Sequence, residues 1–325
     1  MHPAFSVIFL TTLIGAGQGL YLAMVTGQLY AIARFLPAQS EHFYALGSLV
    51  ALLLLGAGLA ASFFHLGRPE RAWRAIAMWR TSWLSREVIV LPIVMVLVFA
   101  YGMAHWLNWT RPLFQLGEAL QVDLTLLLGV LGTLASLALF ICTAMIYAAV
   151  RFLQEWHTPF TVTNFLFLGT ASGFMLAAAY SAYLGNPLVT FYGTWAVILT
   201  LAGLVSRLAH LHRNARLKPK STPQTAIGVR HATLVQKAQG ATGGSFNTRE
   251  FFHGQSQSLV ERLRVLYLVL VFPVPILLIG LSYLSASSSL PIIAFCIQFL
   301  GLLIERWSFF AEARHPQNLY YQSVA

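Results

Sequence analysis

The segment from Leu124 to Val150 reads LTLLLGVLGTLASLALFICTAMIYAAV and contains no charged residue. About 20 apolar residues in a helix are enough to cross the ~30 Å hydrocarbon core of a bilayer. A membrane-barrel strand, in contrast, alternates apolar and polar residues over about ten positions. The uninterrupted apolar run therefore predicts a transmembrane helix.

Seven further apolar runs occur along the chain, each bounded by charged residues or by glycine and proline. Backbone polar groups must be hydrogen-bonded inside a bilayer, which favours helices in all of these runs. We expect an all-α fold, a polytopic membrane protein built as a bundle of eight transmembrane helices, with residues 1–325 forming one integral membrane domain. The first run is too long for a signal peptide, and we expect it to be retained. The predicted spans are residues 4–33, 43–65, 88–108, 124–150, 159–184, 188–206, 263–284 and 290–311.

The composition agrees with a membrane protein and excludes several other classes. Hydrophobic residues make up 58% of the chain and charged residues 9%, against about a quarter charged in soluble domains. The net charge of +10 would suggest nucleic acid in a soluble protein. Here the basic residues lie in loops between apolar runs, so we expect contact with membrane lipids and no nucleic acid. The only two cysteines, Cys142 and Cys296, are too few for an iron–sulfur cluster or a zinc finger.

The basic residues are distributed unevenly between the two faces of the predicted bundle. Of the 20 lysines and arginines, only Arg34 and Arg111 fall on the face opposite the N-terminus. Cytoplasmic loops are enriched in lysine and arginine, so both termini are predicted to be cytoplasmic. The polar loop 207–262 would lie on the same side, either as a docking segment for a partner or as a mobile linker.

Two spacings of glycine predict where helices approach each other closely. They are Gly15-x3-Gly19 and Gly169-x3-Gly173, a pattern typical of tightly packed membrane helices. Gln18 lies in the first of these runs. Its side chain is expected either to line a polar pocket or to form a hydrogen bond between helices.

The stretch that connects the second and third spans contains the residues most suited to a chemical function. It contains FHLGRPERAW at residues 64–73 and WRTSWLSRE at residues 79–87. The helix-stop pattern of a glycine followed by a proline predicts that His65 lies in the last turn of the second span, where a helix C-terminus favours a protonated imidazole. Ser85 is a plausible N-cap of the third span, which would place Glu87 in its first turn. Both side chains could simply complement helix ends, but ionisable groups gathered at a membrane edge commonly mark a functional site.

This run from His65 to Glu87 resembles the signature of the membrane-anchor subunits of the dimethyl sulfoxide reductase family, and the eight-span layout agrees with that family over nearly the whole chain. The resemblance implies a multi-pass subunit of the bacterial cytoplasmic (inner) membrane. Such a subunit anchors a molybdopterin catalytic subunit and a four-cluster iron–sulfur subunit and exchanges electrons with the quinone pool, either ubiquinone or menaquinone. His65 and Glu87 match the positions that the family associates with quinone binding and its protons.

The chemistry of these residues suits that role. Quinone reduction requires two electrons and two protons, and histidine titrates near neutrality. Glu87 could relay a second proton, while Arg68, Arg71 or Arg86 could hold that carboxylate charged or stabilise an anionic form of the quinone. We expect His65 and Glu87 to act in catalysis and all five residues to bind the quinone. The chain itself is expected to carry no haem or iron–sulfur cluster, and to be either a non-catalytic or a quinone-reactive subunit of an oxidoreductase complex.

The predicted orientation helps to distinguish between members of the family that the sequence resembles. A cytoplasmic catalytic partner suits its sulfite-oxidising members, whereas respiratory dimethyl sulfoxide reductases, which oxidise quinol, commonly work on the outer face. The first interpretation is preferred and the second is the alternative. Basic loops that dock an acidic partner would, however, mimic the orientation signal.

Three functions of other kinds stay open at the level of the sequence. A haem b subunit would need axial ligands at matching depth, for which His42 and His105 are the candidates. A transporter would need charges inside its spans, and Glu305 with Arg306 is the main instance. A purely structural anchor would need none of these residues for quinone chemistry.

Overall fold

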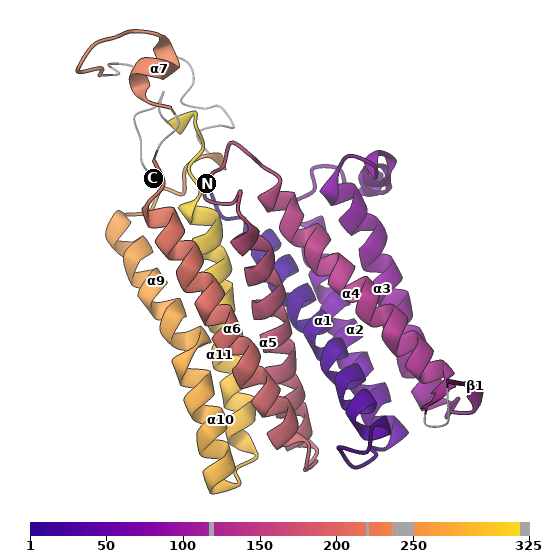
Figure 1. The fold of residues 1–325 in the computed structure, drawn as a ribbon. Helices are drawn as coiled ribbons and strands as arrows, with labels where there is room; N and C mark the ends of the chain where they lie inside the picture. Colours follow the sequence, from indigo (N-terminus) through magenta and orange to yellow (C-terminus); the bar gives the residue numbers. More distant parts are fainter. Residues whose placement is uncertain (117–119, 219–220, 236, 238–249, 319–325) are drawn as a thin grey trace.

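The computed structural model describes residues 1–116, 120–218, 221–235, 237 and 250–318. Eight of its helical segments are long and apolar enough to cross a membrane, which confirms the predicted number of spans. Figure 1 shows them as one bundle of roughly parallel rods. The spans are α1 (Phe5–Ile32), α2 (Glu41–Phe63), α3 (Trp83–Trp106), α4 (Leu124–Ala148), α5 (Pro159–Tyr183), α6 (Val189–Ala215), α9 with α10 (Gln257–Val271 and Pro273–Ser285) and α11 (Ser289–Glu312).

The seventh span is divided into two helices at Phe272. This residue has φ −109° and ψ −78°, both displaced by more than roughly 30° from ideal α-helical values, and Pro273 begins α10 directly after it. Proline lacks the amide hydrogen needed for the helical hydrogen bond to the preceding turn, so the helix breaks here.

Shorter elements connect the spans. A 3-10 helix, η1 (Pro69–Met78), joins α2 to α3, and a short helix, α7 (Pro223–Ile227), follows α6. Two strands that were not expected, β1 (Pro112–Leu116) and β2 (Leu120–Asp123), pair antiparallel before α4. Asp123 then caps α4, since its carboxylate accepts a hydrogen bond from the amide of Leu126 at 2.8 Å.

The boundaries of the loop predicted at 207–262 are wrong at both ends. α6 continues from the expected end at residue 206 to Ala215, and α9 begins at Gln257, where Ser256 accepts a hydrogen bond from the amide of Leu259. The first charged residue does not end α6 because that side chain, Arg207, is held inside the protein. Much of the remaining loop lies outside the described residues.

The centre of the bundle is the crossing of α1 and α5. Of the most apolar part of each helix, 78% of α1 and 67% of α5 is buried, against 28–39% in the other spans, which face outward over much of their surface. A Cβ atom added to Gly173 would lie 2.0 Å from the carbonyl carbon of Gly19, and one added to Gly19 would lie 2.4 Å from the carbonyl oxygen of Gly169. These contacts confirm the close approach predicted from the two glycine spacings.

The N-terminus lies at one end of the bundle, together with α7, whereas β1 lies at the opposite end (Figure 1). The terminal amine of Met1 donates a hydrogen bond to the carbonyl oxygen of Ala313 at 2.7 Å. Since α1 leaves the terminal end and α2 returns to it, the connection between α2 and α3 is also at that end. We refer to this end as the terminal face.

Candidate functional site

His65 lies just outside α2, not in its last turn as predicted. The helix ends at Phe63 and Phe64 is its C-cap, so the imidazole belongs to an exposed turn on the terminal face. Partial burial lowers the pKa of His65 below its ordinary value. This shift disfavours the protonated imidazole, opposite in direction to the effect expected from the helix end.

The N-cap of α3 is Ser82, not Ser85 as predicted. The hydroxyl of Ser82 accepts a hydrogen bond from the amide of Ser85 at 3.3 Å. This earlier start places Glu87 in the second turn of α3, where the side chain points into the bundle and is only 7% exposed. Glu87 is thus a buried carboxylate and not a residue that complements the helix N-terminus.

Thr143 of α4 is the hydrogen-bond partner of Glu87. The Oγ1 hydroxyl of Thr143 donates to Oε1 of Glu87 at 2.5 Å. It is the one hydrogen bond described for this carboxylate, so Oε2 is left for a ligand or a water molecule. The contact joins residues on two helices that pack against each other.

The three arginines expected near Glu87 point elsewhere. Arg86 donates from Nε to the carbonyl of Trp79 at 2.9 Å and from Nη2 to the carbonyl of Arg80 at 2.7 Å, and its guanidinium lies 4.2 Å from the ring centre of Trp83. Arg68 is exposed, and Arg71 makes a surface ion pair of 3.9 Å with Glu70. Among the described ion pairs none involves Glu87, and no described hydrogen bond joins it to His65.

The α2–α3 connection instead forms a basic and aromatic surface. Four large side chains of η1 and the turn that follows are exposed, and arginines stack on two of them. Such a surface has the composition of protein interfaces, which are enriched in tryptophan, methionine and arginine. The exposed residues are Trp73, Ile76, Met78 and Trp79.

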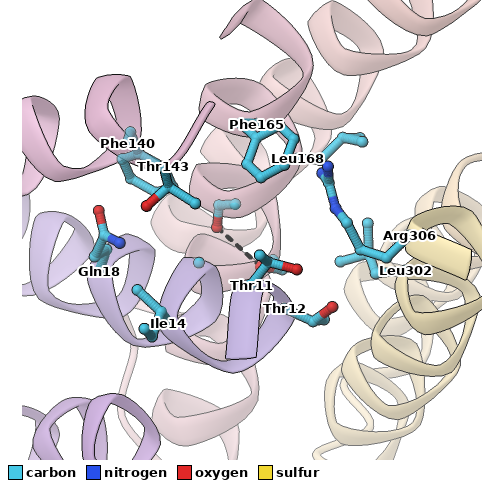
Figure 2. A pocket seen from close by; sticks show the side chains of 13 residues that line it. Thr11, Thr12, Ile14, Gln18, Phe140, Thr143, Phe165, Leu168, Leu302 and Arg306 are labelled. Carbon is cyan, nitrogen blue, oxygen red and sulfur yellow. Dashed lines mark hydrogen bonds between the residues drawn. The ribbon is translucent and has the colours of Figure 1, made fainter. Parts of the chain in front are cut away.

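Thr143 also lines a small cavity between α1, α4, α5 and α11; we call it the inner cavity. Its volume is about 20 Å³, which is room for about one water molecule. Figure 2 shows Thr143 and Gln18 on one side and Arg306 on the other. Oε1 of Gln18 is buried and has no hydrogen-bond partner in the described part of the chain, so Gln18 lines a polar pocket, the first of its two predicted environments.

A network of buried charges follows on from Arg306. Glu305, at 0% exposure, lies 3.4 Å from Nε of Arg306 and 3.2 Å from Nε of Arg207, which is also at 0% exposure. Arg207 continues to Glu312 at 3.5 Å, and Glu312 to Arg264 at 3.3 Å. Within the membrane such charges are rare and costly unless paired, and they commonly mark a pathway for ions or protons.

Sequence reasoning identified Glu305 and Arg306 as unusual but missed Thr143, Arg207 and Glu312. Thr143 is one hydroxyl among many in apolar spans and carries no separate signal. Arg207 was assigned to a loop, although its spacing of three from His210 continues the helical period of the sixth span.

The two histidines considered for haem do not face a common site. His42 is exposed and stacks on Trp106 with 5.1 Å between ring centres, while His105 is buried, hydrogen-bonded to Glu41 and in edge contact with Tyr101. In the described part of the chain, no three histidine, cysteine, aspartate or glutamate side chains gather as a metal site would require. Haem ligation by His42 and His105 therefore gains no support.

Comparison with known proteins places the chain in a family. Residues 1–321 match the model of the DMSO reductase anchor subunit (DmsC) family. The chain belongs to this family. It is therefore a multi-pass membrane anchor subunit of a complex of the DMSO reductase type.

Two relatives are informative. The chain is 87% identical to a sulfite dehydrogenase subunit of Allochromatium vinosum over 325 residues, which is 100% of both proteins. It is 31% identical to the anaerobic dimethyl sulfoxide reductase chain YnfH of Escherichia coli over 157 residues, covering 47% of this chain and 49% of the relative. The resemblance inferred from residues 65–87 is thus confirmed at the level of the family.

Proposed function

We propose that this anchor subunit passes electrons between a partner iron–sulfur subunit and the quinone pool, as part of a complex that oxidises sulfite. The observation that carries the proposal is the position of Glu87, a buried carboxylate near the terminal face with one oxygen bonded to Thr143 and the other available. The full-length identity to a sulfite dehydrogenase subunit supports the substrate. We propose the bacterial cytoplasmic membrane as its location, with the basic terminal face in the cytoplasm.

The residues at this place fit a quinone. A quinone accepts two electrons and two protons when it is reduced. Glu87 can hold one proton inside the bundle, and His65, exposed on the terminal face, can hold another. The exposed apolar side chains of Phe63, Phe64 and Leu84 flank these two residues in sequence. The inner cavity is too small for a quinone ring, so we place the ring outside it, by the α2–α3 connection.

Partner docking is proposed on the same face. The arginines and tryptophans of η1 are exposed, so an acidic surface of an iron–sulfur subunit would meet complementary charge there. This docking would bring a cluster close to the proposed quinone position. The four-cluster subunit in turn would connect this chain to a molybdopterin catalytic subunit.

The test compares Glu87→Gln and His65→Gln with the wild type in the intact complex. Sulfite-dependent reduction of a short-chain quinone should fall in both variants, while sulfite-dependent reduction of an artificial dye and subunit assembly are kept. Glu261→Gln, an exposed carboxylate of α9, serves as the control. Normal quinone reduction in both variants would refute the assignment.

A reductase that oxidises quinol is the second candidate, favoured by the partial identity to a dimethyl sulfoxide reductase chain. The two candidates use the same residues but opposite electron flow. Dimethyl sulfoxide reduction driven by quinol, without sulfite oxidation, would favour the second.

A further inference from the structure

A row of charged side chains from α6, α9 and α11 lies outside the quinone site proposed above. The row runs from the interior of the bundle to its surface. Their contacts run from Arg306 to Glu305, Arg207, Glu312 and Arg264, with separations of 3.4, 3.2, 3.5 and 3.3 Å. Glu305 and Arg207 are fully buried. Arg264 at the far end has a side chain that is 40% exposed.

Each end of this row of charged side chains lies on a cavity. The inner end is Arg306, which lines the inner cavity together with Thr143, the partner of Glu87 (Figure 2). At the outer end, Glu312 and Arg264 line a second cavity of about 80 Å³, large enough for several waters. Met1 lines this outer cavity as well, which places it at the terminal face.

Several polar atoms of these charged side chains have no hydrogen-bond partner among the described residues. In the described part of the structure, both carboxylate oxygens of Glu305 lack a partner with hydrogen-bond geometry, as do Nη1 of Arg306, Oε1 of Glu312 and Nε of Arg264. Buried polar atoms are normally hydrogen-bonded, to water where protein is absent. Unsatisfied atoms occur on four of the five side chains, so they indicate water molecules beside this row of charges. Ion pairs that satisfied one another completely would leave no such atoms.

Other polar groups also contact this row of charged side chains. The hydroxyl of Tyr267 accepts from Nε of Arg207 at 3.1 Å, and Nδ1 of His210 lies 3.4 Å from Nη1 of Arg207. His210 is fixed in turn by Asn164 at 2.9 Å and by the carbonyl of Glu155 at 2.9 Å. These contacts hold Arg207 between the two glutamates.

We propose that Glu312 and Glu305 conduct protons from the terminal face to Glu87, by way of the outer cavity, the inner cavity and the hydroxyl of Thr143. The inference rests on the proposed quinone function and adds a supply route to it. Each reduced quinone takes up two electrons from the iron–sulfur partner and two protons, and the route supplies the proton that Glu87 delivers.

The steps conserve charge and atoms. A proton from bulk solvent enters through the water of the outer cavity, which is left neutral, and protonates the Glu312 carboxylate. Glu312 passes the proton to Glu305 through water held by Arg207. Glu305 releases it to water beside Arg306, the residue that both contacts Glu305 and lines the inner cavity. Water in the inner cavity then protonates the Thr143 oxygen as the original Thr143 proton moves to Glu87. Each glutamate of the route is left ionised again. The arginines keep their protons throughout and serve only to hold carboxylates and water.

The experiment uses Glu305→Gln and Glu312→Gln in the intact complex reconstituted in liposomes. Quinone reduction by sulfite, followed by the absorbance of the quinone, should slow by about tenfold or more, and the solvent deuterium isotope effect on quinone reduction should rise. Reduction of an artificial dye by sulfite should not change. Glu261→Gln, on the exposed side of α9, should match the wild type in all measurements.

A second measurement separates conduction from a structural role. The side chain of Glu312 is 10% exposed and lies on the outer cavity, so a small weak acid such as formic acid should restore the rate of quinone reduction in Glu312→Gln. A purely structural defect would not be restored. If Glu305→Gln does not assemble, the rescue of Glu312→Gln alone decides the outcome.

Wild-type rates and isotope effects in assembled Glu305→Gln and Glu312→Gln would overturn the proton route, as would a slow Glu312→Gln that the acid does not rescue. If Glu87→Gln were still impaired, the quinone function would stand without the route. A wild-type complex that reduces no quinone would instead refute the proposed function itself.

Discussion

Replacing Gly173 by alanine should separate the two central helices of the bundle. The added Cβ would lie 2.0 Å from the carbonyl carbon and 2.2 Å from the Cα of Gly19, whereas nonbonded carbons prefer about 3.5–4.0 Å. The neighbours are backbone atoms, so no side-chain rotation can relieve the contact and α1 must move by roughly 1.5 Å. Such overpacking costs about 3 kcal/mol, at the upper end of the usual range.

The matched control is Gly56→Ala. Gly56 lies in α2, and no atom comes within 4 Å of an added Cβ there, so that variant reports only the helix preference of alanine, which is neutral to favourable by about 1 kcal/mol. Thermal unfolding of the detergent-solubilised complex, followed by intrinsic fluorescence, should show a Tm lowered by roughly 5 °C in Gly173→Ala and unchanged or raised in Gly56→Ala. Equal Tm values for the two variants would refute the close crossing of α1 and α5.

Three further predictions address the polar sites. Thr143→Val removes the hydrogen bond to Glu87, worth about 1.5–3 kcal/mol for a charged acceptor, so quinone reduction should fall by about 10- to 100-fold while dye reduction persists; an unchanged rate would contradict the role of Thr143. Because burial lowers the pKa of His65 below 6.5, the imidazole stays mostly neutral at pH 6.5 and protonates fully only in more acid solution. Quinone reduction should therefore rise as the pH falls below 6.5, because more of the imidazole then carries the proton it delivers, and this rise should be absent in His65→Gln; the same rise in both proteins would count against this histidine. Arg207→Met leaves Glu305 with one cation fewer and should destabilise the subunit by about 3–5 kcal/mol, measured by its unfolding temperature, with much of the loss recovered in Arg207→Met/Glu305→Met; no recovery would argue against their coupling.

Several features could be predicted from the sequence because they depend on local properties. The length of an uninterrupted apolar run determines whether a helix can cross the bilayer, and eight such runs became eight spans. The glycine spacings of α1 and α5 predicted their crossing, since only small residues let two backbones approach so closely. The motif between residues 65 and 87 was distinctive enough to indicate the family.

Other features could not be predicted from the sequence because they depend on which residues face each other across the bundle. Ser82 and Ser85 are both suitable N-caps, and the choice between them moved Glu87 from the first turn into a buried position. Thr143 became the partner of Glu87 only through the rotation of α4 against α3. Hydropathy alone ended the predicted sixth span before Arg207, because a hydropathy criterion places charged residues in water, outside the membrane.

The sequence by itself determined that this chain is a bundle of eight membrane helices, since the number of apolar runs long enough to cross a bilayer sets the number of spans, and it determined which end carries the basic loops. Tertiary structure alone decided where charge is tolerated within that bundle. Arg207 of α6 and Glu305 of α11 remain in helices at full burial because each finds the other across the bundle at 3.2 Å. Pairing across helices replaces the solvation that a bilayer cannot provide, and such pairing exists only after the helices have packed.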